Sequence, residues 1–263
     1  EHLLVLTPLV KGISTAHLLD RYFEQLDAST YPNHLISIGL LVTDSADSTL
    51  LEALESRVRR LQGRWFKRFH AISVYQRHFE LTHNDEPYDL TIMARARNFL
   101  LAASLRDFHS WVAWVDVDVV KYPPTVFDDL MRIDGDVVVP NCLAYREDNA
   151  FWAYDRSNWA ETDYSLEMQK WVGQDFILME ALFSLFSWGL VDMPTHLGKE
   201  HKVPLDGVGA TFTLVKSHVH REGANFPPFV YQHQVEAEAF GKVANAMGFS
   251  VYGLPGYMVY HAE

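Results

Sequence analysis

The sequence predicts an α/β protein built on a mostly parallel β-sheet with helices on both faces. Three observations support this prediction. Strand-like and helix-like segments alternate through the first half of the chain, which is the rhythm of repeated βαβ units. Hydrophobic residues make up 48% of 263 residues, enough for one large core. No internal repeat, low-complexity tract or linker interrupts the chain, so we expect one domain over residues 1–263.

The first half alternates two kinds of apolar pattern. Short runs with β-branched residues predict strands, and apolar residues spaced three or four apart predict helices with one buried face. The expected order is strand 2–6, helix 16–26, strand 35–42, helix 50–61, strand 69–75, helix 93–105, strand 111–120, a short helix to about residue 133, and strand 136–140.

The second half is less regular. Residues 141–170 are rich in Asn, Asp, Tyr and Trp and are expected to form a long loop. The expected order after it is helix 175–186, loop 194–209, strand 211–216, helix 234–247 and two short apolar pieces at 250–254 and 257–260.

The charge balance limits the possible partners. The formal net charge is −12 and no run of Lys and Arg stands out, so nucleic acid is not an expected partner. A polyanionic ligand would have to be met locally, by a metal ion or a few arginines. The single cysteine, Cys142, forms no internal disulfide, and no apolar stretch reaches the roughly 18 residues that span a bilayer.

The strongest local signal is Asp116-Val117-Asp118, at the end of an apolar, aromatic run. Two carboxylates two residues apart on an extended segment project to the same side. Their mutual repulsion and desolvation favour a bound cation, and a divalent ion bridging carboxylates and a diphosphate suits the carboxyl end of a strand. The alternatives are two solvated aspartates, or a haloacid-dehalogenase-type phosphatase, which would have Thr where this chain has Val120.

Two further segments are candidates for binding or catalysis. Arg97 and Asn98 lie on the predicted helix before that strand, where they are either solvated or a clamp on diphosphate oxygens. Asp206 stands beside Gly207 and Gly209, which would let the backbone approach a ligand closely or would simply form a turn.

Several of these segments together resemble one known family, the fungal Golgi mannosyltransferases of the mannan polymerase complexes (glycosyltransferase family 62). The likeness runs from Thr7 to His261, and only segment 183–203 departs from the expected pattern. The segments that carry it are Ala96–Asn98, Trp111–Val120, Tyr154–Asp155 with Asn158–Trp159, Leu205–Gly209, Thr213–Lys216, and Gly253–Pro255 followed by Val259–His261.

The resemblance implies a GT-A fold, which is a Rossmann-like sheet whose N-terminal half binds the nucleotide and whose C-terminal half binds the acceptor. It also implies GDP-mannose as donor and Mn²⁺ as cofactor, a metal that suits mixed carboxylate and imidazole ligands. The implied positions are Asp116, Asp118 and His261 for the metal, Thr7, Pro8 and Asp44 for the guanosine, and Arg97, Asn98 and Asp116 for the donor diphosphate.

The same resemblance implies retention of the α-configuration and extension of a mannan or N-glycan outer chain, with an α-1,6 linkage expected. Retention needs a carboxylate nucleophile or same-face attack by the acceptor hydroxyl, and the sequence does not choose between them. Asp206, Glu180 and Asp175 are the candidate acceptor-side carboxylates. The family further implies a hetero-complex with a related subunit, and a lumenal domain of a type II Golgi membrane protein whose anchor helix lies outside this sequence.

Two other functions compete with this interpretation. A non-catalytic subunit could keep the fold and stabilise a partner, although the presence of all three candidate metal ligands favours an enzyme. A nucleotidyltransferase on a similar fold would carry a glycine-rich loop after the first strand, whereas residues 7–12 contain one glycine.

Overall fold

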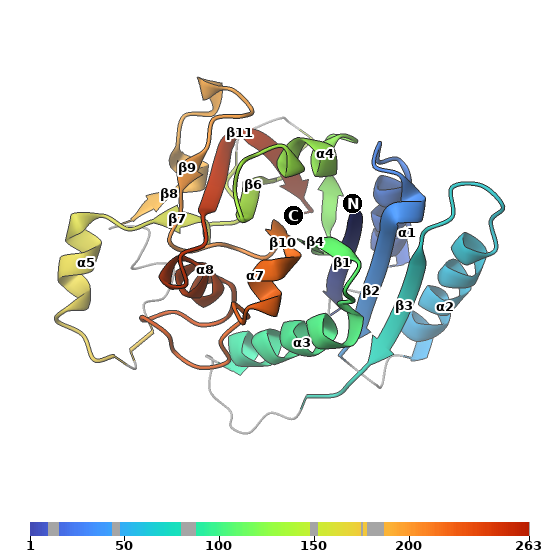
Figure 1. Cartoon of the computed structure of the whole chain (residues 1–263), viewed down its shortest axis with the longest axis horizontal. Coiled ribbons are helices and arrows are strands. Elements are labelled where there is room, and N and C mark those ends of the chain that lie inside the picture. Colours follow the sequence, from blue (N-terminus) through green and yellow to red (C-terminus); the bar gives the residue numbers. More distant parts are fainter. Residues whose placement is uncertain are drawn as a thin grey trace.

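A nine-stranded sheet forms the centre of the computed structural model, which describes residues 1–9, 16–43, 48–79, 88–147, 152–174, 176–177 and 187–262 (Figure 1). The strand order is β3-β2-β1-β4-β10-β6-β11-β5, and β9 pairs with β11. These strands are β1 (His2–Leu9), β2 (Ile36–Val42), β3 (Ala71–Gln76), β4 (His109–Val115), β5 (Val119–Lys121), β6 (Val137–Ala144), β9 (Val203–Pro204), β10 (Phe212–Lys216) and β11 (Val251–His261).

Most of the sheet is parallel, as predicted. Strands β1 to β4 are mutually parallel, and β11 is parallel to β6. Strand β10 runs antiparallel between β4 and β6, so β4 and β6 share one direction. We call the end of the sheet where β1, β2, β3, β4, β6 and β11 finish the carboxyl end, and the opposite end the amino end.

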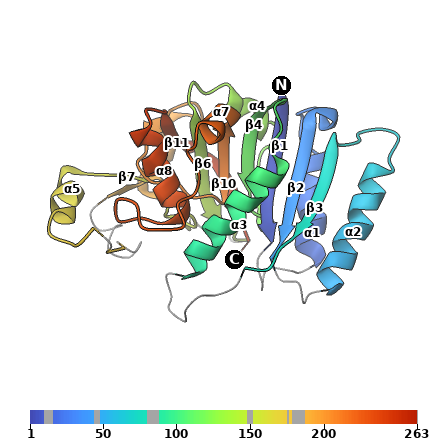
Figure 2. The same cartoon turned by 60° about the horizontal axis from the view of Figure 1, so that its bottom comes forward.

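Helices cover both faces of this sheet, which confirms the prediction from the βαβ rhythm (Figure 2). The helices α1 (Ala16–Asp27), α2 (Ser48–Gln62) and α4 (Val126–Met131) share one hydrophobic core with the sheet. The other core is shared by α3 (Tyr88–Ser104), α7 (Ser217–Arg221) and α8 (Glu236–Ala246). Among the described residues, no helix is long and apolar enough to cross a bilayer.

The predicted strand 111–120 is wrong, because the chain turns at the two aspartates. Strand β4 ends at Val115, and the backbone N–H of Val119 donates to the carbonyl of Asp116 at 3.2 Å. Asp116 and Asp118 therefore do not lie on one extended segment. The chain continues as the short strand β5, which pairs antiparallel with β11.

The predicted loop 141–170 is also more ordered than expected. Strand β6 continues to Ala144, and a two-stranded sheet follows from β7 (Trp159–Ala160) and β8 (Trp188–Gly189). Helix α5 (Asp163–Gln169) begins with a capping box in which Thr162 and Ser165 bond each other's backbone N–H groups. The two apolar pieces expected at the chain's end form the single strand β11, with an irregularity between Leu254 and Met258. Of the predicted helix 175–186, all but residues 176–177 lie outside the described residues.

Candidate functional site

Asp118 and His261 meet at the carboxyl end of the sheet. The β5–β11 pairing sets His261 opposite Val119, one residue after Asp118. The backbone N–H of Ala262 donates to the carbonyl of Asp118 at 2.8 Å, which fixes the two segments side by side. As a result, His261 Nε2 lies 2.7 Å from Asp118 Oδ1. This carboxylate oxygen is buried and has no hydrogen bond of good geometry within the described part of the chain.

The orientation of the His261 ring is set by two neighbours. Its Nδ1 donates to the carbonyl of Ala262, so Nε2 is the nitrogen that faces Asp118. The ring of Tyr154 stacks on the imidazole with centroids 3.6 Å apart and planes 13° from parallel. A backbone carbonyl on the far nitrogen is the usual way in which proteins orient a metal-binding histidine.

Asp116 faces a buried arginine from the preceding helix. Arg97 Nη2 lies 3.5 Å from Asp116 Oδ1, a long contact, while Arg97 Nε donates to Glu236 Oε1 at 2.6 Å. The guanidinium lies beside the rings of Trp114 and Phe226, 5.4 and 5.7 Å from their centroids. Its remaining nitrogen, Nη1, is buried and has no hydrogen-bond partner among the described residues. A buried charged donor without a partner is costly, so this site favours an anionic ligand.

Glu236 is the residue at this site that sequence reasoning missed. Its side chain is 9% exposed and lies at the first residue of α8, with a positive φ of 57°. Such a backbone conformation is strained for a residue with a side chain and is often found at functional positions. An acidic first turn is ordinary in helices, so no sequence pattern distinguished Glu236 from a residue that complements the helix dipole.

The pKa values of Asp116 and His261 are both raised, for different reasons. Desolvation raises the pKa of Asp116 to about 7; Arg97 opposes this rise and the charge of Asp118 adds to it. At His261, burial disfavours the charged ring, but the adjacent negative charge of Asp118 outweighs burial and raises the pKa. Burial therefore makes the charged form of Asp116 costly, and a cation bound beside Asp116 and Asp118 would relieve that cost.

The residues present fit a divalent metal ion only in part. Adjacent ligands of a six-coordinate ion with bonds of about 2.1 Å lie roughly 3 Å apart, close to the spacing of Asp118 Oδ1 and His261 Nε2. In the neutral ring with its proton on Nδ1, His261 presents the Nε2 lone pair beside the carboxylate oxygen of Asp118. Within the described ranges, no three His, Cys, Asp or Glu side chains are grouped tightly enough to hold a metal. The pair is thus a half-site that needs ligand or solvent oxygens, an arrangement typical of ions bound together with phosphates.

Two predicted substrate contacts have their polar groups engaged inside the protein. Thr7 is fully buried, and its hydroxyl donates to the carbonyl of Val115 at 2.6 Å and lies 2.8 Å from the hydroxyl of Tyr22. Pro8, the next residue of β1, is buried as well. The amide of Asn98 bonds both backbone groups of Phe226, at 2.7 and 3.1 Å, so it anchors the segment before α8.

The segment Leu205–Gly209 is built around internal contacts. A Cβ atom at Gly207 would collide with the Trp159 ring, and one at Gly209 with the Asp155 carboxylate. These glycines therefore allow close approach of the protein to itself, a different reason from the ligand contact expected from the sequence. Asp206 Oδ2 accepts a hydrogen bond from the backbone N–H of Glu161 at 2.7 Å.

Asp206 belongs to a different polar group from Asp116 and Asp118. Burial raises its pKa, and the charges that act on it come from Glu161 and Lys242 rather than from the aspartates or Arg97. The three other predicted residues, Asp44, Asp175 and Glu180, lie outside the described residues. The structure therefore brings together Asp118 with His261 and Asp116 with Arg97, and leaves Asp206 apart.

Comparison with known sequences gives one family. The Anp1 family model matches residues 1–230. The Mannan polymerase II complex anp1 subunit of Schizosaccharomyces pombe is 35% identical over 99% of this chain and 64% of its own length. The corresponding ANP1 subunit of Saccharomyces cerevisiae is 34% identical over 92% of this chain and 52% of its own length. The chain thus spans between half and two thirds of the length of these two relatives.

Comparison with solved structures agrees on the fold. The mannosyltransferase PcManGT from Pyrobaculum calidifontis, solved with GDP-Man and Mn²⁺, has a TM-score of 0.53 and 12% identity over all of this chain and 56% of its own. GalNAc-T7, solved with UDP, GalNAc and Mn²⁺, has a TM-score of 0.59 and 13% identity over all of this chain and 44% of its own. These likenesses confirm the predicted GT-A fold of glycosyltransferases.

Proposed function

The chain belongs to the Anp1 family, and from this premise we propose that it is the catalytic domain of a retaining α-mannosyltransferase. In this proposal it takes mannose from GDP-mannose and adds it, through an α-1,6 linkage, to an oligomannose acceptor of the N-glycan outer chain or mannan. Support comes from the GT-A fold and from relatives named as mannan polymerase subunits. The observation that carries the proposal is the Asp118–His261 half-site, which lies at the same end of the sheet as the Arg97 network.

In this proposal Asp118 and His261 would hold Mn²⁺ together with Asp116, the third ligand that the family resemblance implies. When bound, the ion would supply positive charge that stabilises the leaving diphosphate. Arg97 would donate to phosphate oxygens through Nη1, the nitrogen that has no protein partner among the described residues. Glu236 fixes the guanidinium through Nε, so the nitrogens that face the donor are oriented before it binds.

The Arg97 guanidinium is buried beside Trp114 and Phe226, and exclusion of water strengthens its interaction with a developing negative charge. As the bond to the diphosphate breaks, the anomeric carbon acquires oxocarbenium character. The acceptor hydroxyl then attacks either from the same face or after a carboxylate nucleophile. Asp206, Asp175 and Glu180 are the proposed acceptor-side carboxylates, and full transfer by an Asp206→Asn variant would remove Asp206 from the mechanism.

The proposal includes partners and a location. Relatives are named as subunits of mannan polymerase complexes, which supports assembly with a related glycosyltransferase subunit. The lumenal side of the Golgi membrane is the corresponding location, with the acceptor glycan presented there.

The test is the change in melting temperature caused by GDP, measured with and without Mn²⁺. A ligand that binds only the folded state raises the melting temperature. We expect a shift with GDP and Mn²⁺ together that is lost in Asp118→Ala and in His261→Ala. The control Asp107→Ala removes an exposed carboxylate at the amino end and should keep the full shift. A shift that does not depend on Mn²⁺, or that survives in Asp118→Ala, would contradict the metal site.

A non-catalytic subunit is the second candidate. The observation in its favour is that the described residues bring together two metal-binding side chains rather than three. Such a subunit would bind GDP and Mn²⁺ weakly or not at all, and would transfer no mannose. Measuring release of GDP from GDP-mannose in the presence of an oligomannose acceptor separates the two candidates.

A further inference from the structure

Helix α5 exposes apolar side chains that a surface helix normally buries. Tyr164, Met168 and Trp171 follow one another at spacings of four and three residues, so they line one side of the helix and of the turn that continues it. Their exposed fractions are 56%, 39% and 79%. The residues that α5 turns toward the protein are polar instead, since Ser165 is buried and Gln169 is half-buried. We call Tyr164, Met168 and Trp171 the α5 stripe.

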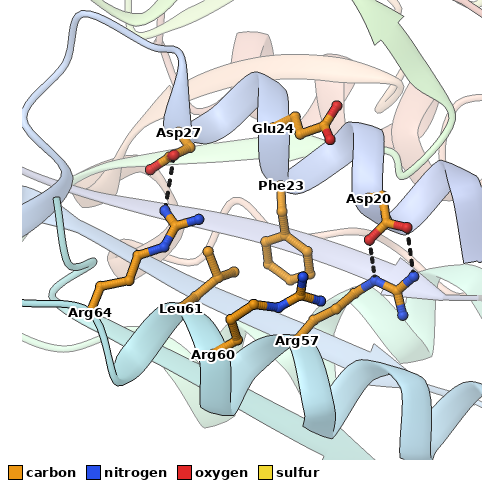
Figure 3. Close-up of a pocket in the computed structure, with 8 residues that line it drawn as sticks. All are labelled: Asp20, Phe23, Glu24, Asp27, Arg57, Arg60, Leu61 and Arg64. Atoms are coloured by element: carbon orange, nitrogen blue, oxygen red, sulfur yellow. Dashed lines mark hydrogen bonds and ion pairs between the residues drawn. The ribbon is translucent and has the colours of Figure 1, made fainter.

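Helices α1 and α2 show the usual arrangement. Phe23 of α1 and Leu61 of α2 are buried where the two helices meet, and charged residues lie outside them, with Arg57 paired to Asp20 at 2.5 Å (Figure 3). The apolar sides of these two helices are thus covered within the chain. Helix α5 differs in this respect, and it stands away from the sheet at one side of the molecule (Figure 1 and Figure 2).

The α5 stripe is large enough for a protein interface. Its three side chains leave roughly 400 Å² of mostly apolar surface open to solvent at these exposed fractions. Apolar patches of this size mark interaction sites, and the area matches the apolar half of the about 800 Å² that each partner of a standard interface buries. Trp, Tyr and Met are also among the residue types enriched at protein interfaces.

The base of α5 is firmly held, so the stripe is presented in one orientation. The capping box of Thr162 and Ser165 fixes the first turn. Just before it, Glu161 Oε1 accepts hydrogen bonds from Lys242 Nζ at 2.8 Å and from Gln169 Nε2 at 2.7 Å. The Lys242 side chain is buried, which ties the helix to the body of the protein. A surface that is ordered before binding loses little conformational entropy when a partner docks on it.

The charge around the stripe selects the kind of partner. Residues 161–177 contain four acidic residues and a single cation, Lys170, which pairs with Glu167 at 2.6 Å. Helices that lie on a lipid surface carry Lys and Arg on their polar side, so this segment does not suit a membrane. A second copy of the stripe would set acidic residues against acidic residues, between chains that each carry a net charge of −12. The complementary surface is therefore an apolar groove with basic side chains at its rim, on a different protein.

We propose that the α5 stripe is the docking surface for the related glycosyltransferase subunit. The stripe would enter an apolar groove of that subunit, and Asp163 and Glu167 would face basic residues at the rim of the groove. A helix whose apolar side lies in a groove is a common mode of recognition between proteins. The inference rests on the proposed function, which includes assembly with a related subunit, and it names the surface through which the two chains assemble.

The test is the association of this chain with a second Anp1-family chain from the same organism, co-expressed and purified with it. Light scattering and sedimentation measure the mass of the pair and its dissociation constant. Met168→Ser with Trp171→Ser should raise the dissociation constant about tenfold or more, because Trp side chains buried at an interface dominate its affinity. Asp163→Asn with Glu167→Gln should raise it severalfold and make it less dependent on salt.

The matched control is Trp65→Ser with Phe66→Ser, on the connection between α2 and β3. These side chains are 90% and 79% exposed, and α2 lies on the opposite side of the molecule from α5 (Figure 1). The control should pair as the unchanged chain does. Unchanged melting temperatures of all variants would show that the differences in pairing are not caused by unfolding.

Three results would overturn the proposal. No pair could form, the α5 variants could pair as well as the control, or the chain alone could dimerise through α5, which would make a second copy the occupant. Pairing is measured without donor or metal, and none of the changed residues belongs to the candidate site. Loss of pairing with an intact GDP and Mn²⁺ effect on the melting temperature would therefore refute the docking surface alone. Pairing that depends on α5 in a chain without that effect would refute the proposed transfer reaction alone.

Discussion

Carboxylates at the two ends of the same sheet have opposite environments. At the amino end, Asp136 accepts hydrogen bonds from the backbone N–H and hydroxyl of Ser250, at 3.0 and 2.8 Å, and from Lys216 Nζ at 3.1 Å. Burial alone would raise its pKa, but these bonds outweigh burial and lower it. At the carboxyl end, desolvation raises the pKa of Asp116 to about 7, and a buried oxygen of Asp118 faces His261 Nε2 at 2.7 Å.

This difference separates structural from functional groups. At Asp136, the protein itself satisfies the charge, so the contacts hold β6, β10 and β11 together and leave nothing for a ligand. At Arg97, buried Nη1 lacks a hydrogen-bond partner within the described chain, which is costly unless something outside it completes the contact. At Asp118, the buried oxygen Oδ1 faces the ring nitrogen of His261.

The largest expected effect is on transfer activity, from a change at the carboxyl end of the sheet. Asp118→Asn keeps the shape of the side chain but removes its charge, so kcat for mannose transfer should fall by about 10²–10³-fold, as for loss of one electrostatic contact to a transition state. The measurement is release of GDP from GDP-mannose under saturating Mn²⁺. Asp107→Asn, at the exposed amino end, is the control and should retain its activity. Equal activity of the two variants would mean that Asp118 has no part in transfer and serves the fold alone, as Asp136 does.

A large effect on stability is expected at Gly207, whose backbone packs directly against the Trp159 ring. Gly207→Ala forces a methyl group into the Trp159 ring and should lower the free energy of unfolding by about 3 kcal/mol. Gly173→Ala is the matched control, since no atom lies within 4 Å of its added Cβ and its effect should stay below about 0.5 kcal/mol. Denaturant unfolding of both variants provides the comparison. Equal stability of Gly207→Ala and Gly173→Ala would contradict the close packing of Gly207 against the Trp159 ring.

A smaller effect on stability is expected at Glu236, which pairs with the buried Arg97. Glu236→Gln removes the charge that offsets buried Arg97 and should cost about 2 kcal/mol of unfolding free energy. Because Glu236 orients the Arg97 guanidinium before the diphosphate binds, GDP with Mn²⁺ should raise the melting temperature less in this variant than in the unchanged chain. Asp20→Asn, which removes a partly exposed ion pair with Arg57, should cost less than about 1 kcal/mol and leave the GDP effect unchanged. An identical GDP shift in both variants would contradict the role of Glu236.

The smallest expected effect is on the pH dependence of stability, from a change of Asp136 at the amino end of the sheet. Because the folded pKa of Asp136 is lowered, its contribution is fully present above the unfolded pKa of about 4 and is lost as pH falls through the folded pKa. Asp136→Asn should therefore be about 1 kcal/mol less stable near neutral pH, and the difference should vanish in acid. Urea unfolding across this pH range measures it. A difference that is independent of pH would show that the charge of Asp136 contributes nothing.

Local patterns predicted the architecture well because strands and helices are set by short-range periodicity. The alternating apolar segments led to the parallel sheet and to helices on both faces. The turn at Asp116–Asp118 was missed because the flanking valines have high strand propensity, while the turn depends on a bond from Asp116 N–H to Thr211 O at 2.9 Å, far along the chain. Helix α5 was missed because it depends on a capping box in a segment whose composition indicated a loop.

The candidate site could be predicted only where it coincides with a motif. Asp118 was predicted from the Asp-x-Asp pattern and His261 from the family resemblance, and the structure brings them within contact distance. Glu236 was not predictable, because its importance comes from a strained backbone and from Arg97 on a distant helix. The opposite error arose at Asn98, whose position beside Arg97 suggested a ligand contact although its amide is fully used by Phe226.

The pairing of β5 with β11 has a consequence for the order in which the protein matures. Asp118 follows β4, near the middle of the chain, whereas His261 ends the last strand of the sheet. Chains fold broadly as they are synthesised, and contacts between distant segments form late. The first sheet segments can therefore assemble while the two ligands are still apart. Competence to bind a metal ion would then report that β11 has docked, so that an incompletely folded chain holds no ion and consumes no donor.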